Sequence, residues 1–259
     1  MTSNPYIRSV LYFVGFYMLS VILGAVLTYI LKDFLFINPN LNGVINIISY
    51  IIILILLILI KKNKSKRIEK FEKKYLLISI LFPLFFILTL DPIYNIDYIK
   101  GENLIINDVN VDFFNVVLLI KIIQLLILTP FLEEFFFRRI LIENFDKKNN
   151  KIKVILFTSL LFALAHTNPF SLNFYQIAGA FVLGLLTGLI YFKANFIYCV
   201  LAHLIYNMVI MLTSGKFYWT IIEELSFGLT YWFLWFISFI GFLFVLLFML
   251  KKIRKLEKC

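Results

Sequence analysis

Long runs of apolar residues, each close to the length of a membrane-crossing helix, follow one another along the whole chain. A hydrocarbon core about 30 Å thick requires about 20 apolar residues in one helix. Lipid also leaves the backbone only helices or closed barrels as spanning structures. The pattern predicts eight transmembrane helices, at residues 10–31, 41–60, 75–90, 115–141, 154–166, 174–192, 196–213 and 227–250. We therefore expect an all-α, polytopic membrane protein.

The composition excludes a water-soluble protein and gives no sign of a second domain. Hydrophobic residues make up 62% of the 259 residues and aromatic residues 18%, and the mean hydropathy is +0.93. Between the apolar runs there is no Gly/Ser linker and no polar block long enough to bury a core of its own. We therefore expect a single membrane domain over residues 1–259.

The basic residues predict how the chain is oriented. Eight lie within 61–74, six within 138–153 and five within 251–258, and with Arg8 and Lys193 this makes 21 of the 25. Eight crossings place all of these segments on one face. Because an excess of lysine and arginine marks the cytoplasmic side, both termini are expected in the cytoplasm.

The same distribution explains the net charge of +10. Basic residues in short cytoplasmic loops set topology and attract anionic lipid headgroups, so the expected partner is the lipid bilayer and not nucleic acid. Cys199 lies within a span and Cys259 at the cytoplasmic end, which makes a disulfide or a cysteine-based metal cluster unexpected.

Two adjacent carboxylates in the fourth span, Glu133 and Glu134, are predicted to have different roles. Glu134 and Arg138 are four residues apart, share a helix face and stand in the favoured order for an ion pair. Glu133 points about 100° away and lacks that arginine. Glu133 is therefore the candidate general base, and Pro130 just before the pair can bend the helix.

The two histidines of the chain, His166 and His203, also lie in apolar runs and also have same-face companions. Phe162 precedes His166 by four residues and can brace the imidazole, while Asn207 follows His203 by four. An imidazole and an amide aimed at one point can form an oxyanion hole. Ionisable groups at membrane depth are costly and mark functional sites. A buried catalytic site is the expectation, against the alternative that each side chain merely joins neighbouring helices.

Three motifs together resemble a known family. The sequences Glu-Glu-x-x-x-Arg at 133–138, Phe-x-x-x-His at 162–166 and His-x-x-x-Asn at 203–207 are similar to those of the CPBP family. That family contains the type II CAAX prenyl endopeptidases and the bacterial Abi-type intramembrane proteases. The likeness covers about residues 115–214, a predicted catalytic core preceded by N-terminal helices in 1–114.

The resemblance implies an all-helical intramembrane endopeptidase. In it Glu133 and His166 activate water, His203 and Asn207 stabilise the oxyanion, and Glu134, Arg138 and Phe162 support them. Family members are described both as metalloproteases and as glutamate-dependent enzymes. Glu133, His166 and His203 could thus hold a divalent metal such as zinc with one position open for water, or act without a metal.

Three functions remain open from the sequence. The first is a protease acting on membrane-associated peptides or lipidated protein termini, with a site that opens toward the cytoplasm or laterally to lipid. The second is a non-catalytic membrane partner, such as an immunity or scaffold protein. The third is a small proton-linked transporter, although the pair of broken, inverted-repeat helices expected of one is missing.

Composition and spacing give two further expectations. A bias toward Ile, Lys, Asn and Phe is typical of an AT-rich bacterial genome, so we expect a multi-pass protein of a bacterial cell membrane with a peptide precursor as substrate. Ala180, Gly184 and Gly188 form a small-residue stripe that lets helices approach closely. This stripe is expected to hold the sixth span against the fourth and seventh.

Overall fold

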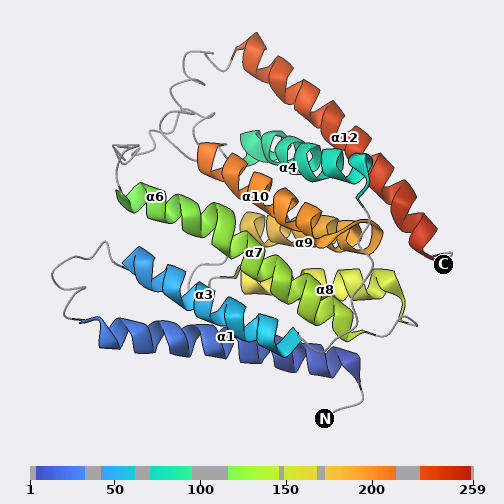
Figure 1. Cartoon of the computed structure of the whole chain (residues 1–259). Helices are drawn as coiled ribbons and strands as arrows, with labels where there is room; N and C mark the ends of the chain where they lie inside the picture. Colours follow the sequence, from blue (N-terminus) through green and yellow to red (C-terminus); the bar gives the residue numbers. More distant parts are fainter. Residues whose placement is uncertain are drawn as a thin grey trace.

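The protein, seen here as a computed structural model, is a bundle of helices (Figure 1). The structure describes residues 4–32, 42–61, 71–94, 116–145, 149–167, 173–213 and 228–257, and these ranges contain no β-strand. The predicted all-α membrane fold is confirmed.

Every apolar run of the sequence forms a helix. Their bounds are α1 Pro5–Ile30, α3 Asn42–Lys61, α4 Lys73–Tyr94, α6 Val116–Ile122, η2 Ile123–Leu128, α7 Thr129–Glu134, η3 Phe135–Leu141, η4 Ile142–Asn144, α8 Lys151–Ala165, α9 Phe174–Lys193, α10 Phe196–Thr213 and α12 Leu229–Glu257. The segments from α6 to η4 follow one another without a break and form the fourth span.

Consecutive spans run in opposite directions, so the basic segments of the chain, which follow every second span, lie at the same end of the bundle. In Figure 1, α1 begins and α12 ends at the right-hand side, where α3 and the fourth span also end and α4, α8 and α10 begin. Because the basic segments adjoin these helix ends, we call this side the basic end. Its assignment to the cytoplasm stays a prediction from the charge rule.

Among the described residues, six helices are long and apolar enough to cross a membrane: α1, α3, α4, α9, α10 and α12. The other two predicted spans are the fifth, whose predicted range of 154–166 is already short for a bilayer, and the fourth. The helix α8 has only 15 residues and ends before His166, which caps it. The fourth span is long enough in total, but π-helical turns divide it into short pieces.

The small-residue stripe of α9 packs mainly against α8, the fifth span, while the helix as a whole also contacts α10, the seventh. A Cβ added to Gly184 would lie 3.0 Å from the Ser159 Cα, and one added to Gly188 would lie 3.1 Å from the Ile155 Cγ2. Only Gly188 also borders the fourth span, with Arg138 Nη1 3.7 Å from the same added atom. Glycine is needed here because the two backbones come too close for larger side chains.

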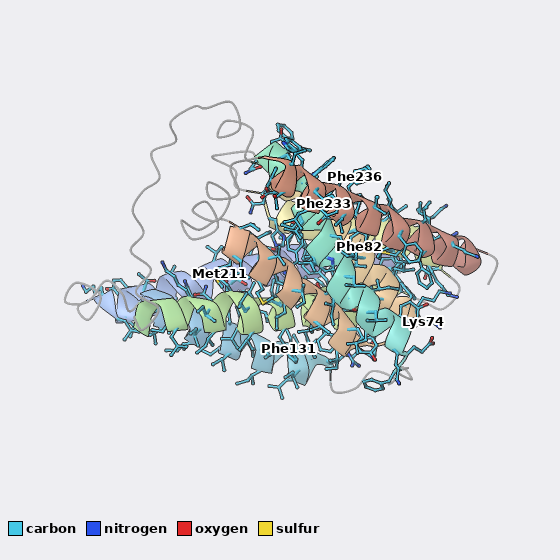
Figure 2. The ribbon with its side chains drawn as sticks, turned by 90° about the horizontal axis from the view of Figure 1, so that it is seen from above. Lys74, Phe82, Phe131, Met211, Phe233 and Phe236 are labelled. Atoms are coloured by element: carbon cyan, nitrogen blue, oxygen red, sulfur yellow. The ribbon has the colours of Figure 1, made fainter. Side chains whose placement is uncertain are left out.

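The outer helices present large apolar side chains away from the bundle, as expected for a surface that meets lipid. Figure 2 labels Phe233 and Phe236 on α12 at the edge of the molecule, and their side chains are 63% and 52% exposed. The other side of α12 is tied to α4 by polar contacts. The Tyr231 hydroxyl donates to Asp91 at 2.6 Å, and the Trp235 indole N–H donates to the Thr89 carbonyl at 3.0 Å.

Candidate active site

The fourth span carries the first motif on an irregular helix. In η2 the Thr129 N–H donates to the carbonyl of Gln124, five residues back, which is the π-helical pattern. Continued by one residue, that pattern pairs the Leu125 carbonyl with residue 130, but Pro130 has no N–H. The Asn207 side-chain amide donates to this carbonyl at 2.9 Å instead. Pro130 thus leaves the Leu125 carbonyl to a side-chain donor from another helix, while the predicted bend of the helix stays a prediction.

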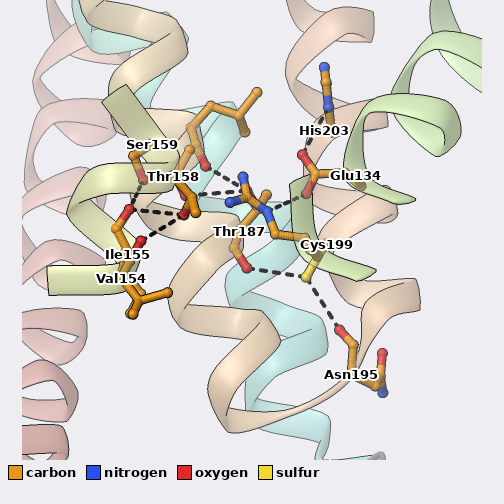
Figure 3. A network of polar contacts seen from close by, with 12 residues as sticks. Glu134, Val154, Ile155, Thr158, Ser159, Thr187, Asn195, Cys199 and His203 are labelled. Carbon is orange, nitrogen blue, oxygen red and sulfur yellow. Dashed lines mark hydrogen bonds and ion pairs between the residues drawn. The ribbon is translucent and has the colours of Figure 1, made fainter. Parts of the chain in front are cut away.

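Glu134 lies at the centre of a fully buried polar network (Figure 3). Its Oε2 accepts from Arg138 Nε at 2.8 Å, which confirms the predicted ion pair, and neither side chain has exposed area. Its Oε1 accepts from His203 Nδ1 at 3.2 Å. Arg138 Nη2 also donates to the Thr187 hydroxyl at 2.6 Å. The two charges thus compensate each other where solvent is excluded.

Further polar bonds continue from this network toward the basic end (Figure 3). The Cys199 thiol bonds to the Thr187 carbonyl at 3.2 Å and to the Asn195 carbonyl at 3.4 Å. Asn195 Oδ1 accepts from the Tyr198 N–H at 2.9 Å and so caps the start of α10. Cys199 is a buried free thiol within this network.

Glu133 lies apart from this network and faces the other histidine. Its Oε2 is 3.5 Å from His166 Nε2, and the side chains of Glu133 and His166 are 18% and 24% exposed. Among the described residues this oxygen has no hydrogen-bond partner. His166 Nδ1 is 2.8 Å from the Phe162 carbonyl, which can only accept, so Nδ1 carries a proton. In the neutral imidazole the Nε2 lone pair then faces Glu133.

The Phe162 ring packs between the two imidazoles. Its centroid is 4.7 Å from that of His166 and 5.5 Å from that of His203. The Arg138 guanidinium lies 5.6 Å from the same centroid. Phe162 therefore braces His166, as predicted from the spacing, and also fixes the position of the second histidine and the arginine.

Three of the four predicted catalytic side chains meet at one cavity of about 420 Å³, and the fourth lies beside it. His166, His203 and Asn207 line the cavity, while Glu133 contacts its wall through His166. The remaining wall contains both apolar and polar side chains. They are Ile87, Asp91, Phe162, Asn173, Gln176, Ala180, Leu183, Tyr206, Ile210 and Thr213.

The cavity does not extend toward the basic end, which was one of the two openings that the sequence left possible, the other being lateral to lipid. The position of His203, only about 10 Å along α10 from Phe196, by itself favours an opening at the basic end. Depth along one helix does not show how neighbouring helices pack, and here buried side chains of the Glu134 network occupy the basic side of His203. The cavity instead follows α9 and α10 away from the basic end.

Asn207 is not the unattached donor that the sequence suggested, because one N–H of its amide is bonded to Leu125. A primary amide has two such hydrogens and a carbonyl oxygen. Since Asn207 also lines the cavity, the bond to Leu125 orients the amide and leaves its second N–H for another acceptor. Asn207 can therefore still contribute one N–H, beside His203, to the predicted oxyanion hole.

The residues predicted to hold a metal are of suitable type but are not grouped as a ligand set. Two histidines and a glutamate with one open position are common around catalytic zinc. Within the described part of the chain, however, no three His, Cys, Asp or Glu side chains lie close enough to share an ion. Of the three predicted ligands, Glu133 and His166 face each other, whereas His203 has its Nδ1 turned to Glu134.

Two residues of the site were missed by the sequence analysis. Thr187 satisfies Arg138 and lies 49 residues from it, and Asp91 lines the cavity from the third span. Thr187 is an ordinary residue in an apolar helix and gives no signal. Asp91 does give one, because it is an acidic residue directly after an apolar run.

Comparison with known proteins agrees with the three motifs. No curated protein and no solved structure matched the chain. Residues 115–209 match the family described as type II CAAX prenyl endopeptidase Rce1-like, a segment that contains Glu133, Arg138, His166, His203 and Asn207. This match over residues 115–209 supports the family that the three motifs predicted.

Proposed function

We propose that the protein is an intramembrane endopeptidase that hydrolyses peptide bonds of membrane-associated peptides or lipidated protein termini. The single observation that carries this proposal is the placement of Glu133 against His166. A carboxylate oxygen without a partner and an imidazole nitrogen lone pair face each other at 3.5 Å beside a cavity. Two acceptors in that position are satisfied by a water molecule that donates to both.

Glu133 is the general base in this proposal, and His166 orients the water. The carboxylate takes one proton as the water oxygen forms a bond to the carbonyl carbon of the substrate. The C–N bond then breaks, and the protonated Glu133 returns the proton to the leaving amine. The products are a carboxylic acid and an amine, so one water is consumed and no oxidant or reductant is needed.

His203 and Asn207 stabilise the negative charge that develops on the substrate oxygen. Glu134 holds the Nδ1–H of His203, which leaves Nε2 for the cavity that His203 lines. When Nε2 is protonated, the carboxylate of Glu134 offsets the added charge. The second N–H of Asn207 completes an oxyanion hole, an arrangement of fixed donors whose effect is large in a site without bulk water.

The test uses the full chain purified in detergent and a set of hydrophobic peptides, some prenylated and some not. Mass spectrometry after incubation should detect two new termini at one bond, and His166→Ala should lose this product. Samples with and without a chelator are run in parallel. Loss of cleavage in the chelator, restored by zinc, would replace the metal-free mechanism with a metal-dependent one.

A binding protein with the same fold would give a different result. Such a chain retains peptides on a column but yields no product, and His166→Ala does not change what it retains. Retention without cleavage across the peptide set would therefore contradict the proposed activity. Recovery of prenylated peptides as the best substrates would overturn the expectation of a peptide precursor.

A further inference from the structure

We infer that the substrate reaches the site from the end of the bundle opposite the basic end, which the charge rule assigns to the outer side of the membrane. The inference builds on the proposed function and specifies its substrate class. That class is an extended peptide segment exposed on the outer face of the membrane.

The first observation is the direction of the cavity along α10. His203, Tyr206, Asn207, Ile210 and Thr213 line it, and Thr213 is the last residue of the helix. Ten residues at 1.5 Å each make this wall about 15 Å long. It begins at the histidine and ends where α10 ends, at the side away from the basic loops.

The second helix of the wall follows the same direction. On α9 the lining residues are Gln176, Ala180 and Leu183, with Asn173 as the cap that precedes the helix. They occupy its first half, which adjoins the end of α10. No residue of the second half, which leads to the basic end, is among the described lining residues.

Buried side chains close the path from the basic end. Beyond the histidines in that direction lie Arg138, Thr187 and Cys199, each one helical turn or more from the cavity and each without exposed area. They are joined to one another and to Glu134 by the hydrogen bonds described above. Opening this route would break a compensated buried ion pair, a costly rearrangement.

The walls of the cavity suit a peptide backbone. The amides of Asn173 and Gln176 and the hydroxyl of Thr213 can bond to backbone N–H and C=O groups, which need partners in a site without bulk water. Ile87 and Ile210 offer apolar contact to side chains in between. A polar lining that continues to the end of the helices is consistent with a segment that enters from water and not sideways from lipid.

Thiol labelling in intact bacterial cells tests the direction. In a Cys259→Ser background the buried Cys199 is retained, and single cysteines are introduced by Gln176→Cys and Ala180→Cys in the cavity. Lys153→Cys at the exposed start of α8 reports the basic end. Ala163→Cys, which is equally buried but does not line the cavity, is the matched control for Ala180. The reagent is a small, charged methanethiosulfonate that does not cross membranes.

The expected result is complete labelling of the Gln176→Cys and Ala180→Cys chains before the cells are permeabilised and no gain afterwards. Lys153→Cys should react only after permeabilisation, and Ala163→Cys only after denaturation. Labelling of Ala180→Cys only after permeabilisation would overturn the inference, as would labelling of Lys153→Cys from outside.

Two further outcomes are decided by additional measurements. If Ala180→Cys reacts from neither side, Ile210→Cys serves as a second position in the cavity, and its failure to react would also contradict the route. Labelling does not depend on cleavage. An inactive chain that shows the expected pattern keeps the route and contradicts only the proposed activity.

Discussion

Two neighbouring glutamates of one helix occupy opposite kinds of environment. Glu134 is completely buried, is paired with Arg138 and accepts from His203. Glu133 is 18% exposed and has, among the described residues, an oxygen without a hydrogen-bond partner 3.5 Å from His166. Two identical side chains one position apart thus lie in different places: Glu134 in a buried polar network and Glu133 beside a cavity.

The difference shows how a helix separates structure from chemistry. A rotation of about 100° between successive residues directs the two carboxylates toward different neighbours. The one that meets an arginine is neutralised and holds helices together. The other, Glu133, keeps a carboxylate oxygen that can accept a hydrogen bond from water. We therefore expect the same isosteric substitution at the two positions to give different losses.

The largest effect is expected from Glu133→Gln. An amide cannot accept the water proton, and loss of a general base lowers the rate about 10²- to 10⁴-fold. Peptide cleavage followed by mass spectrometry should record this loss, while the thermal midpoint in detergent stays near that of the parent chain. Retained cleavage would remove Glu133 from the mechanism.

Glu134→Gln is expected to act on stability first. Removing one partner of a buried ion pair leaves an uncompensated charge on Arg138 and costs about 3–5 kcal/mol. The midpoint of unfolding should fall and the yield from membranes should drop. The double substitution Glu134→Gln with Arg138→Met should recover much of the loss, because it removes the unpaired charge. Equal stability of the Glu133 and Glu134 variants would contradict the contrast between the two sites.

Asn207→Ala sharpens the comparison, because this residue contacts both the irregular helix and the cavity. Loss of one oxyanion donor lowers kcat about 10²- to 10³-fold. If Asn207 serves only to bond the Leu125 carbonyl, its loss lowers the midpoint of thermal unfolding but leaves kcat of the folded protein unchanged. Parallel kinetics and thermal unfolding of Asn207→Ala and Asn207→Asp separate the two roles.

The smallest effect is expected at the contact that supports the Glu134 side, between α8 and α9. Gly184→Leu forces a side chain against Ser159, where even a Cβ lies 3.0 Å from the backbone. Overpacking of this kind costs about 1–3 kcal/mol. Gly24→Leu is the matched control, since a Cβ there has nothing within 4 Å. Thermal unfolding in detergent should show a loss for the first variant alone.

Much of the site could be predicted because its signals are local. The Glu134–Arg138 pair follows from a spacing of four residues, and the pairing of Phe162 with His166 follows from the same period. Other contacts could not be predicted in this way. Thr187 reaches Arg138 across 49 residues and Asn207 reaches Leu125 across 82, and no local rule selects such partners among many apolar neighbours.

The sequence by itself determined the membrane class, the helices and the resemblance to a protease family, because hydropathy over 20 residues and motif spacing are properties of the chain alone. The division into a core at 115–214 and N-terminal helices at 1–114 stays a prediction. Only the tertiary structure decided that π-turns interrupt the fourth span and that the cavity leads away from the basic end. These depend on which helix faces fill the space beside His203, and packing of that kind is fixed only when all the helices are in place.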